Sequence, residues 1–126
     1  MFAKFNTNIP IYKQVKEDIE LSIIRGQKSV GEKLESVREL ALKYGVNPST
    51  IQKALSELER TGLILTKRTV GKFITEDSNM IKAIRLSRSI EEVREFIFKM
   101  YELGNNEEEI LDLINQNKEK RDRNNV

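Results

Sequence analysis

The chain has 126 residues, of which 38% are hydrophobic and 33% charged, and its formal net charge is +2. This length suits one soluble domain, or a small domain with an appendage. The sequence contains no Cys and no His, which excludes a disulfide framework, a thiolate nucleophile, a metal site with Cys or His ligands and a Ser-His-Asp arrangement. We predict a protein that is not an enzyme and has no metal or cofactor.

The two ends of the chain differ in charge. Residues 1–76 carry 13 Lys and Arg against 9 Asp and Glu, whereas residues 77–126 carry 9 against 11. A DNA-facing front half and a partner-facing back half fit this distribution, and so does an ordinary solvated surface. The first residues do not resemble a signal peptide, and no apolar run has membrane-spanning length, so we expect a cytoplasmic protein without a membrane partner.

Two helices are predicted in the first third of the chain. One follows Pro10 and ends near Gly26, with a stripe of apolar residues at helical spacing: Tyr12, Val15, Ile19 and Ile23. After a turn over residues 27–33, Ser36 and Glu39 form a capping box that begins a short second helix. Its apolar positions follow the same spacing, and Gly45 ends it: Val37, Leu40, Ala41 and Tyr44.

A third helix begins with Asn47 as N-cap and Pro48 at the first helical position, where the missing N–H of proline is harmless. Its apolar stripe precedes a stop at Gly62: Ile51, Ala54, Leu55 and Leu58. Two β-prone runs follow, residues 63–66 and 72–75, joined by a basic connection over residues 67–71. This pattern predicts a β-hairpin.

The pattern becomes helical again from Ser78. A first helix of this segment ends at Gly104, and Asn106 with Glu109 marks the start of a second. The tail from Lys118 is polar and is expected to fray. We therefore predict a mainly α fold with a small β-hairpin wing, in which residues 1–76 form a winged helix-turn-helix and residues 77–126 a two-helix dimerisation segment.

This order of elements predicts a DNA-binding surface. The second and third helices brace one another through their apolar faces, which leaves the opposite face of the third helix outward. That face carries short hydroxyls, an amide and a cation, groups that contact base edges and phosphates, while the hairpin tip is basic. The predicted contacts to double-stranded DNA are Ser36, Arg38, Asn47, Pro48, Ser49, Thr50, Gln52, Lys53, Lys67, Arg68 and Thr69. Taken singly, each of these residues is also ordinary at an exposed helix start or hairpin tip.

The stretch from Gly31 to Ile64 resembles the characteristic sequence of the GntR family of bacterial transcription regulators: GEKLESVRELALKYGVNPSTIQKALSELERTGLI. The run Pro10-Ile11-Tyr12-Lys13-Gln14 is similar to the opening helix of that family, and the short helical pair after the wing resembles the YtrA-like subfamily. The resemblance implies a dimeric regulator, usually a repressor, that often controls transporter genes. It also implies that Arg38 holds a phosphate and that Arg68 and Thr69 approach the minor groove. The residues it places in the major groove are Asn47, Pro48, Ser49, Thr50 and Gln52.

Two positions depart from the family pattern. Glu35 stands where the family usually has Pro, and a carboxylate there weakens DNA binding unless it turns away from the phosphates. Thr69 stands where the family favours Gly at the wing tip, and threonine resists a positive φ angle. Gly71 offers an alternative position for the turn.

We expect the helical tail to form a homodimer, because two amphipathic helices of this size cannot bury enough apolar surface alone. The expected dimer residues are Val93, Phe96, Ile97, Met100, Tyr101, Ile110, Leu111 and Ile114. A two-fold dimer would read a palindromic operator. Two alternatives stay open: a monomer whose tail folds back, and a winged helix that binds protein instead of DNA. A small-molecule effector also stays open, since no motif identifies one.

Overall fold

The computed structural model describes the backbone of residues 5–124 and the side chains of residues 5–118. The chain divides into two compact units between Arg85 and Leu86. The first unit contains α1 (Ile11–Ile24), α2 (Val37–Tyr44), α3 (Pro48–Arg60), β1 (Ile64–Lys67), β2 (Gly71–Ile74) and the start of α4 (Ser78–Glu102). The second unit contains the rest of α4 and α5 (Glu107–Asn124).

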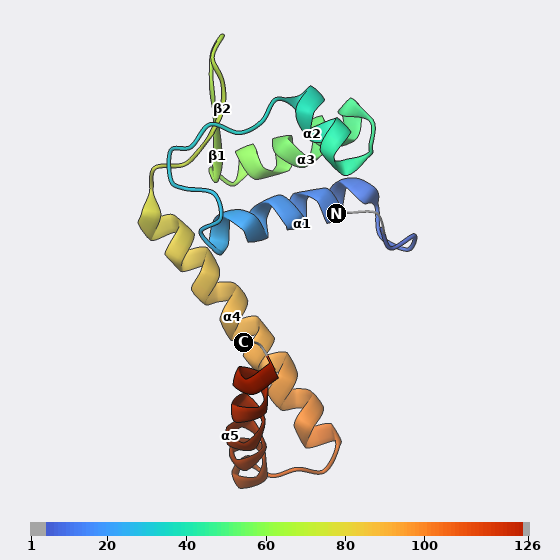
Figure 1. The fold of residues 1–126 in the computed structure, drawn as a ribbon, viewed down its shortest axis with the longest axis vertical. Coiled ribbons are helices and arrows are strands. Elements are labelled where there is room, and N and C mark those ends of the chain that lie inside the picture. Colours follow the sequence, from blue (N-terminus) through green and yellow to red (C-terminus); the bar gives the residue numbers. More distant parts are fainter. Residues whose placement is uncertain (1–4, 125–126) are drawn as a thin grey trace. The chain divides into compact units, whose positions relative to one another are not determined.

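The core of the first unit surrounds α3. Its inner side chains repeat at helical spacing and are almost completely buried: Ile51, Ala54, Leu55 and Leu58. They pack against α1, which contributes Val15, Ile19 and Ile23, and against Leu40 of α2. Figure 1 shows α1 and α2 lying against α3. The apolar stripes predicted for the three helices are therefore confirmed as one shared core, except that Tyr12 is only half-buried and lies outside it.

The predicted ends of α2 are confirmed. The Ser36 hydroxyl accepts a hydrogen bond from the Glu39 amide at 3.1 Å, and the Glu39 carboxylate accepts one from the Ser36 amide at 2.8 Å. Gly45 ends the helix in the left-handed conformation, with φ of 69°. These two ends keep α2 to eight residues and turn the chain sharply into α3.

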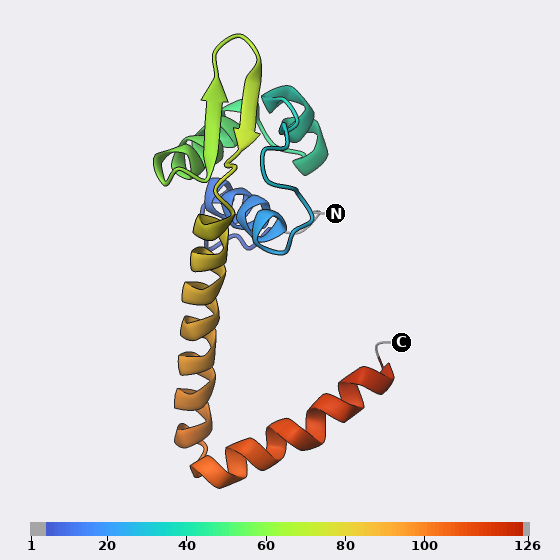
Figure 2. The ribbon, with the colours of Figure 1, turned by 90° about the vertical axis from the view of Figure 1, so that its left-hand side faces the viewer.

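β1 and β2 form an antiparallel hairpin in which Ile64 pairs with Ile74 and Lys67 with Gly71 (Figure 2). The segment before α2 runs along β2, since Lys33 forms a bridge with Phe73 and the Leu34 amide donates to the Lys72 carbonyl at 2.8 Å. The sequence predicted this segment only as a turn. Its backbone instead supports the outer edge of the hairpin, so the wing is joined to the domain on both sides.

The first two turns of α4 belong to the first unit. Ile81 is buried in the shared core, and Met80 and Ile84 pack against it. The Arg85 guanidinium donates to the Ile24 carbonyl at the end of α1, from Nε at 3.1 Å and from Nη2 at 2.6 Å. The compact unit thus extends nine residues beyond the predicted boundary at residue 76, because these side chains pack onto the core.

In the second unit, α4 and α5 meet at a turn and then separate (Figure 2). Gly104 adopts φ of 95° at the turn. Asn106 and Glu109 form the predicted capping box, each accepting from the other's amide at 2.8 Å. The expectation of a frayed tail from Lys118 was wrong as far as Asn124, since α5 continues through these polar residues; residues 125–126 lie outside the described part.

Within residues 5–124, no helix combines the length and the apolar character that crossing a membrane requires. Some large apolar side chains are exposed to solvent, and one of them is Leu42 on α2, which is 79% exposed.

We expect Leu55→Ala to lower the free energy of unfolding by about 2–5 kcal/mol, because it leaves a cavity at the centre of the core. Leu42→Ala is the matched control and should change stability by less than about 0.5 kcal/mol, since this side chain is already in water. Urea unfolding followed by circular dichroism measures both. Equal effects of the two variants would contradict the assignment of the core.

Candidate nucleic-acid interface

The outward face of α3 is polar along its first two turns. Ser49, Gln52, Lys53 and Ser56 are exposed, and Thr50 is half-buried at the edge of this face. Their positions follow from the core, because the opposite side of the helix is buried against α1 and α2. The face offers hydroxyls, an amide and a cation, which can donate to phosphate oxygens and exchange hydrogen bonds with base edges.

Asn47 occupies the N-cap position of α3, but its side chain makes no capping hydrogen bond. The predicted N-cap position is therefore confirmed, without a hydrogen bond from the side chain. The reason lies in the backbone, since the Thr50 amide, which such a cap would bind, donates to the Asn47 carbonyl at 3.0 Å. The exposed Asn47 amide group and the exposed Pro48 ring thus border the polar face of α3.

Lys53 interacts with an aromatic ring from another helix. Its ammonium nitrogen lies 4.3 Å from the centroid of the Tyr12 ring on α1, within the range of a cation–π interaction. The sequence placed Tyr12 only in the apolar stripe of α1 and did not predict this contact. The one hint in the sequence was the position of Tyr12 at the end of that stripe. The contact restricts where the Lys53 charge lies on the polar face.

Ser36 and Arg38 lie at the start of α2, and both are exposed. The Ser36 hydroxyl accepts a hydrogen bond in the capping box, so it fixes the start of α2. Because Ser36 is exposed, a ligand bound at the start of α2 would lie close to it. Arg38 extends from the first turn of α2 and carries a full positive charge in solvent. A guanidinium in this position can bind a phosphate through two parallel hydrogen bonds.

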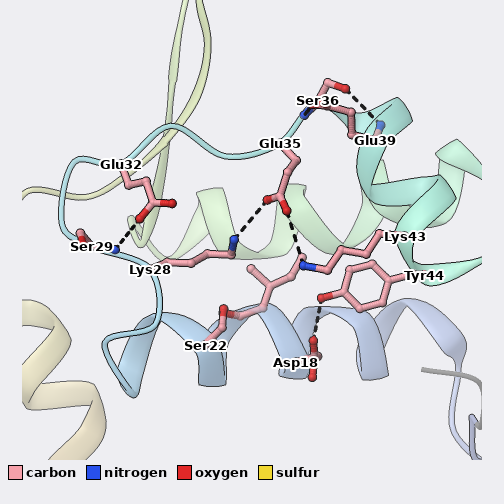
Figure 3. A network of polar contacts seen from close by, with 11 residues as sticks. Asp18, Ser22, Lys28, Ser29, Glu32, Glu35, Ser36, Glu39, Lys43 and Tyr44 are labelled. Atoms are coloured by element: carbon pink, nitrogen blue, oxygen red, sulfur yellow. Dashed lines mark hydrogen bonds and ion pairs between the residues drawn. The ribbon is translucent and has the colours of Figure 1, made fainter. Parts of the chain in front are cut away.

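Glu35 is held by two lysines (Figure 3). Its carboxylate oxygens lie 3.1 Å from Lys28 Nζ and 3.4 Å from Lys43 Nζ. Partial burial acts to raise the pKa of Glu35, but its own backbone amide and the two lysines outweigh burial and lower it. The negative charge that departs from the family pattern is therefore matched by positive charges within the domain.

A second polar contact joins α2 to α1 in the same region. The Tyr44 hydroxyl donates to a carboxylate oxygen of Asp18 at 2.7 Å, and the rest of the Tyr44 side chain is buried (Figure 3). Burial, together with the hydrogen bond and negative charge of Asp18, raises the pKa of Tyr44. Tyr44 therefore stays protonated and able to donate, which fixes the C-terminal end of α2 against α1.

The wing tip consists of Arg68, Thr69 and Val70, all exposed between Lys67 and Gly71. Among the described non-glycine residues only Thr69 has a positive φ, at 65°, so the turn stays at Thr69 although threonine resists this conformation. Gly71 begins β2 and does not relocate the turn. The Lys67 ammonium lies 4.4 Å from the centroid of the Phe73 ring, which keeps this cation close to the hairpin.

A polar cluster at the base of the wing was missed by sequence reasoning. The Lys72 ammonium lies 2.8 Å from a carboxylate oxygen of Glu59 on α3 and donates to the Thr66 hydroxyl at 3.0 Å. The Thr66 hydroxyl also donates to Glu59. Hydrogen bonds from Lys72 and Thr66 lower the pKa of Glu59. The hairpin register, which brings Thr66 opposite Lys72, was needed to find this cluster.

The chemistry of this surface is that of binding. In the described part of the chain, no cluster of three or more Asp or Glu residues is arranged to hold a metal ion. Cations instead extend from three elements, with Arg38 on α2, Lys53 on α3, and Lys67 and Arg68 on the wing. A polar outward helix beside a basic hairpin defines the winged helix-turn-helix class of DNA-binding proteins.

The comparisons with known proteins identify the family. Residues 11–74 match the family model described as "Bacterial regulatory proteins, gntR family", so the chain belongs to the GntR family of bacterial transcription regulators. The resemblance found in the sequence is thereby confirmed, and the protein is a DNA-binding transcription regulator.

Two curated relatives are from Bacillus subtilis strain 168. The chain is 38% identical to "Uncharacterized HTH-type transcriptional regulator YhcF" over 90% of this chain and 94% of that protein. It is 42% identical to "HTH-type transcriptional repressor YtrA" over 57% of this chain and 55% of that protein. The likeness to YhcF therefore includes the helical tail.

Two solved structures extend the comparison. A GntR family transcriptional regulator from Listeria monocytogenes is 42% identical, with a TM-score of 0.84 over 89% of this chain and 98% of that one. The structure of AraR(DBD) in complex with operator ORE1 is 34% identical, with a TM-score of 0.52 over 53% of this chain and 82% of that one. The AraR structure resembles only about half of this chain.

We predict that Glu35→Gln lowers stability at neutral pH by less than about 1 kcal/mol, because the ion pairs are partly exposed. The pKa of Glu35 is lower in the folded protein than its ordinary value of 4.5. Its stabilising effect is therefore present above pH 4.5 and is lost as the pH falls through the folded value. Urea unfolding of both proteins between pH 3 and pH 7 measures the difference.

The matched control is Glu91→Gln on an exposed position of α4, which should change stability at neutral pH by less than about 0.5 kcal/mol. A difference between wild type and Glu35→Gln that stays constant from pH 7 to pH 3 would contradict the assigned ion pairs.

Proposed function

We propose that the protein is a repressor that binds a palindromic operator as a homodimer, with α3 in the major groove and the wing near the minor groove. The observation that carries the proposal is the polar outward face of α3, fixed by burial of the opposite side of the same helix. The operator complex of AraR and the name of the YtrA repressor support DNA binding and repression. Control of transporter genes remains an expectation from the resemblance to the YtrA-like subfamily.

The exposed residues divide into two roles in this proposal. Arg38, Lys67 and Arg68 neutralise phosphates and set the position of the domain on the duplex. Residues at the start of α3 read base edges, with the amide of Gln52 suited to adenine and the hydroxyl of Thr50 to several bases. The remaining contacts assigned to DNA are Ser36, Asn47, Pro48, Ser49, Lys53 and Thr69.

Apolar side chains in the second unit support the homodimer. Val93, Phe96 and Tyr101 are exposed on α4, and Leu111 and Ile114 are exposed on α5. Such a concentration of exposed apolar surface on two neighbouring helices supports a protein partner. With a second copy as that partner, the dimer presents two copies of α3 to half-sites about 34 Å apart, or multiples of that distance.

The other expected dimer residues are less exposed. Ile97 and Met100 are half-buried, and Ile110 is only 4% exposed in the single chain. Ile110 therefore packs within its own unit. We propose that it supports the helices that form the interface and does not itself contact the second copy. Exposed Phe98 and Leu103 add apolar surface beside the predicted set.

In this proposal the protein acts in the cytoplasm, where its DNA lies, and has no enzymatic activity. Binding to DNA needs only positioned donors and cations, and the surface of α3 and the wing provides these groups. A small-molecule effector is a separate matter and needs a site of its own.

Selection of binding sites from a random duplex DNA library with the full-length chain tests the proposal. We expect enrichment of an inverted repeat, which would establish sequence reading and two-fold symmetry together. Absence of enrichment, with only salt-sensitive background binding, would contradict sequence-specific recognition and favour a winged helix that binds protein.

Variants separate the two roles on the selected site. Arg38→Gln should weaken binding to all sequences alike and reduce the slope of log K against log salt concentration by about one per subunit. Thr50→Ala should weaken binding mainly at the selected site. Arg94→Gln, an exposed arginine of the second unit, is the control and should change neither quantity. If both test variants behave like the control, the assigned surface is wrong.

The dimer has a direct test in light scattering at micromolar concentration. We expect a mass of twice the 14.6 kDa chain for the wild type, and a monomer for Phe96→Asp, because a carboxylate at an apolar interface is strongly unfavourable. Leu42→Asp places the same charge on an exposed leucine of the first unit and should stay dimeric. Monomer mass for the wild type would rule out the homodimer.

A further inference from the structure

A hollow of about 320 Å³ lies in the first unit, beside the end of α1. Its walls come from the end of α1, the turn over residues 26–30 and the first two turns of α4. None of its lining residues belongs to the surface assigned to DNA, which lies on α2, α3 and the wing. The hollow is large enough for a small metabolite and stands apart from the proposed DNA contacts.

Three cations line this hollow: Lys28 from the turn, and Lys82 and Arg85 from α4. The hydroxyls of Ser29 and Ser78 line it as well, whereas no carboxylate is among the lining residues. Cations and hydroxyl donors gathered around one space are suited to the oxygens of carboxylate or phosphate groups. The start of α4 does not add to this attraction, because the Asp77 carboxylate already accepts a hydrogen bond from the Met80 amide there.

Apolar side chains line the hollow as well: Ile23 of α1, Ile81 of α4 and Val30 of the turn. Ile23 and Ile81 are buried in the shared core, whereas Val30 is 48% exposed and offers most of the apolar surface. A ligand with a short carbon stem can pack on Val30, which inorganic phosphate cannot do. The lining therefore combines groups for the charged ends of a molecule with a surface for its apolar part.

Carboxylates and a backbone carbonyl near the hollow already engage some of these groups and therefore limit how tightly a ligand binds. Glu35 pairs with Lys28 at 3.1 Å, so a ligand shares this cation with an internal carboxylate. Asp77 caps α4 by accepting from the Met80 amide at 3.1 Å, and Glu76 lies against Gly31. Arg85 donates to the Ile24 carbonyl, so a ligand shares this guanidinium with a contact inside the protein.

We propose that this hollow binds a small organic dianion, whose charged groups meet Lys28, Lys82 and Arg85 and whose carbon stem packs on Val30. The ligand joins the turn after α1 to the first turns of α4, beside the bond from Arg85 to Ile24 at the end of α1. Its role as an effector of DNA binding rests on the proposed function, whereas its binding to the hollow does not.

The test is an NMR titration of the ¹⁵N-labelled full-length chain without DNA. Succinate and glycerol 3-phosphate are the two probes, each compared with sodium chloride at equal ionic strength. We expect saturable shifts of the Ser29, Ser78 and Lys82 amides with at least one probe, and the tighter of the two identifies the ligand as a carboxylate or a phosphate. Lys82→Gln should weaken this binding about tenfold, as loss of one charged hydrogen bond implies.

Lys99→Gln is the matched control, because Lys99 is an exposed lysine of the same helix outside the hollow. It should leave the affinity of either probe unchanged. The proposal is overturned if neither probe gives saturable shifts, if the shifts centre on α3 and the wing, or if the two lysine variants weaken binding equally. Because DNA is absent from the titration, its result does not depend on whether the protein binds an operator.

Discussion

The inner face of α3 packs against α1 and α2, and the other features of the first unit depend on this packing. Ile51, Ala54, Leu55 and Leu58 are buried there together. A helix with one side buried can present only its other side, so the polar residues of α3 face outward as a consequence of core formation. Stability and the proposed recognition of DNA thus depend on the same apolar contacts, while different residues of one helix serve each purpose.

Polar contacts around this core fix the elements that carry the exposed cations. The hydrogen bond from Tyr44 to Asp18 holds one end of α2, and the capping box of Ser36 and Glu39 defines the other. Glu59 of α3 binds Lys72 at the base of the wing. The contact of Tyr44 joins α2, which carries Arg38, to α1, and the contact of Glu59 joins the wing to α3. In this domain, ion pairs act mainly by orienting elements, since partly exposed pairs add little stability.

The helix α4 serves both compact units. Its first two turns complete the core through Ile81 and bind the end of α1 through Arg85. Its later turns expose Phe96 and Tyr101. The same helix therefore carries residues of the proposed ligand site at its start and residues of the proposed homodimer further along.

Much of the fold and part of the site could be predicted from the sequence, because local signals act over a few residues. Apolar spacing located the helices, Ser36 with Glu39 and Asn106 with Glu109 marked two helix starts, and the family pattern located the DNA-binding segment. Other features depend on residues that are far apart in the chain. The contact of Lys53 with Tyr12 and the cluster of Glu59 with Lys72 arise only after folding.

The sequence alone determined the winged helix-turn-helix class, the order of the elements and the residues that α3 leaves exposed, since periodicity and helix ends are written in neighbouring residues. Only the tertiary structure decided that Glu35 is neutralised by Lys28 and Lys43, that Asn47 leaves its capping bond to the backbone, and that residues 77–85 join the first unit. These outcomes depend on distances between separate segments, and such distances are set by the packing of the whole core.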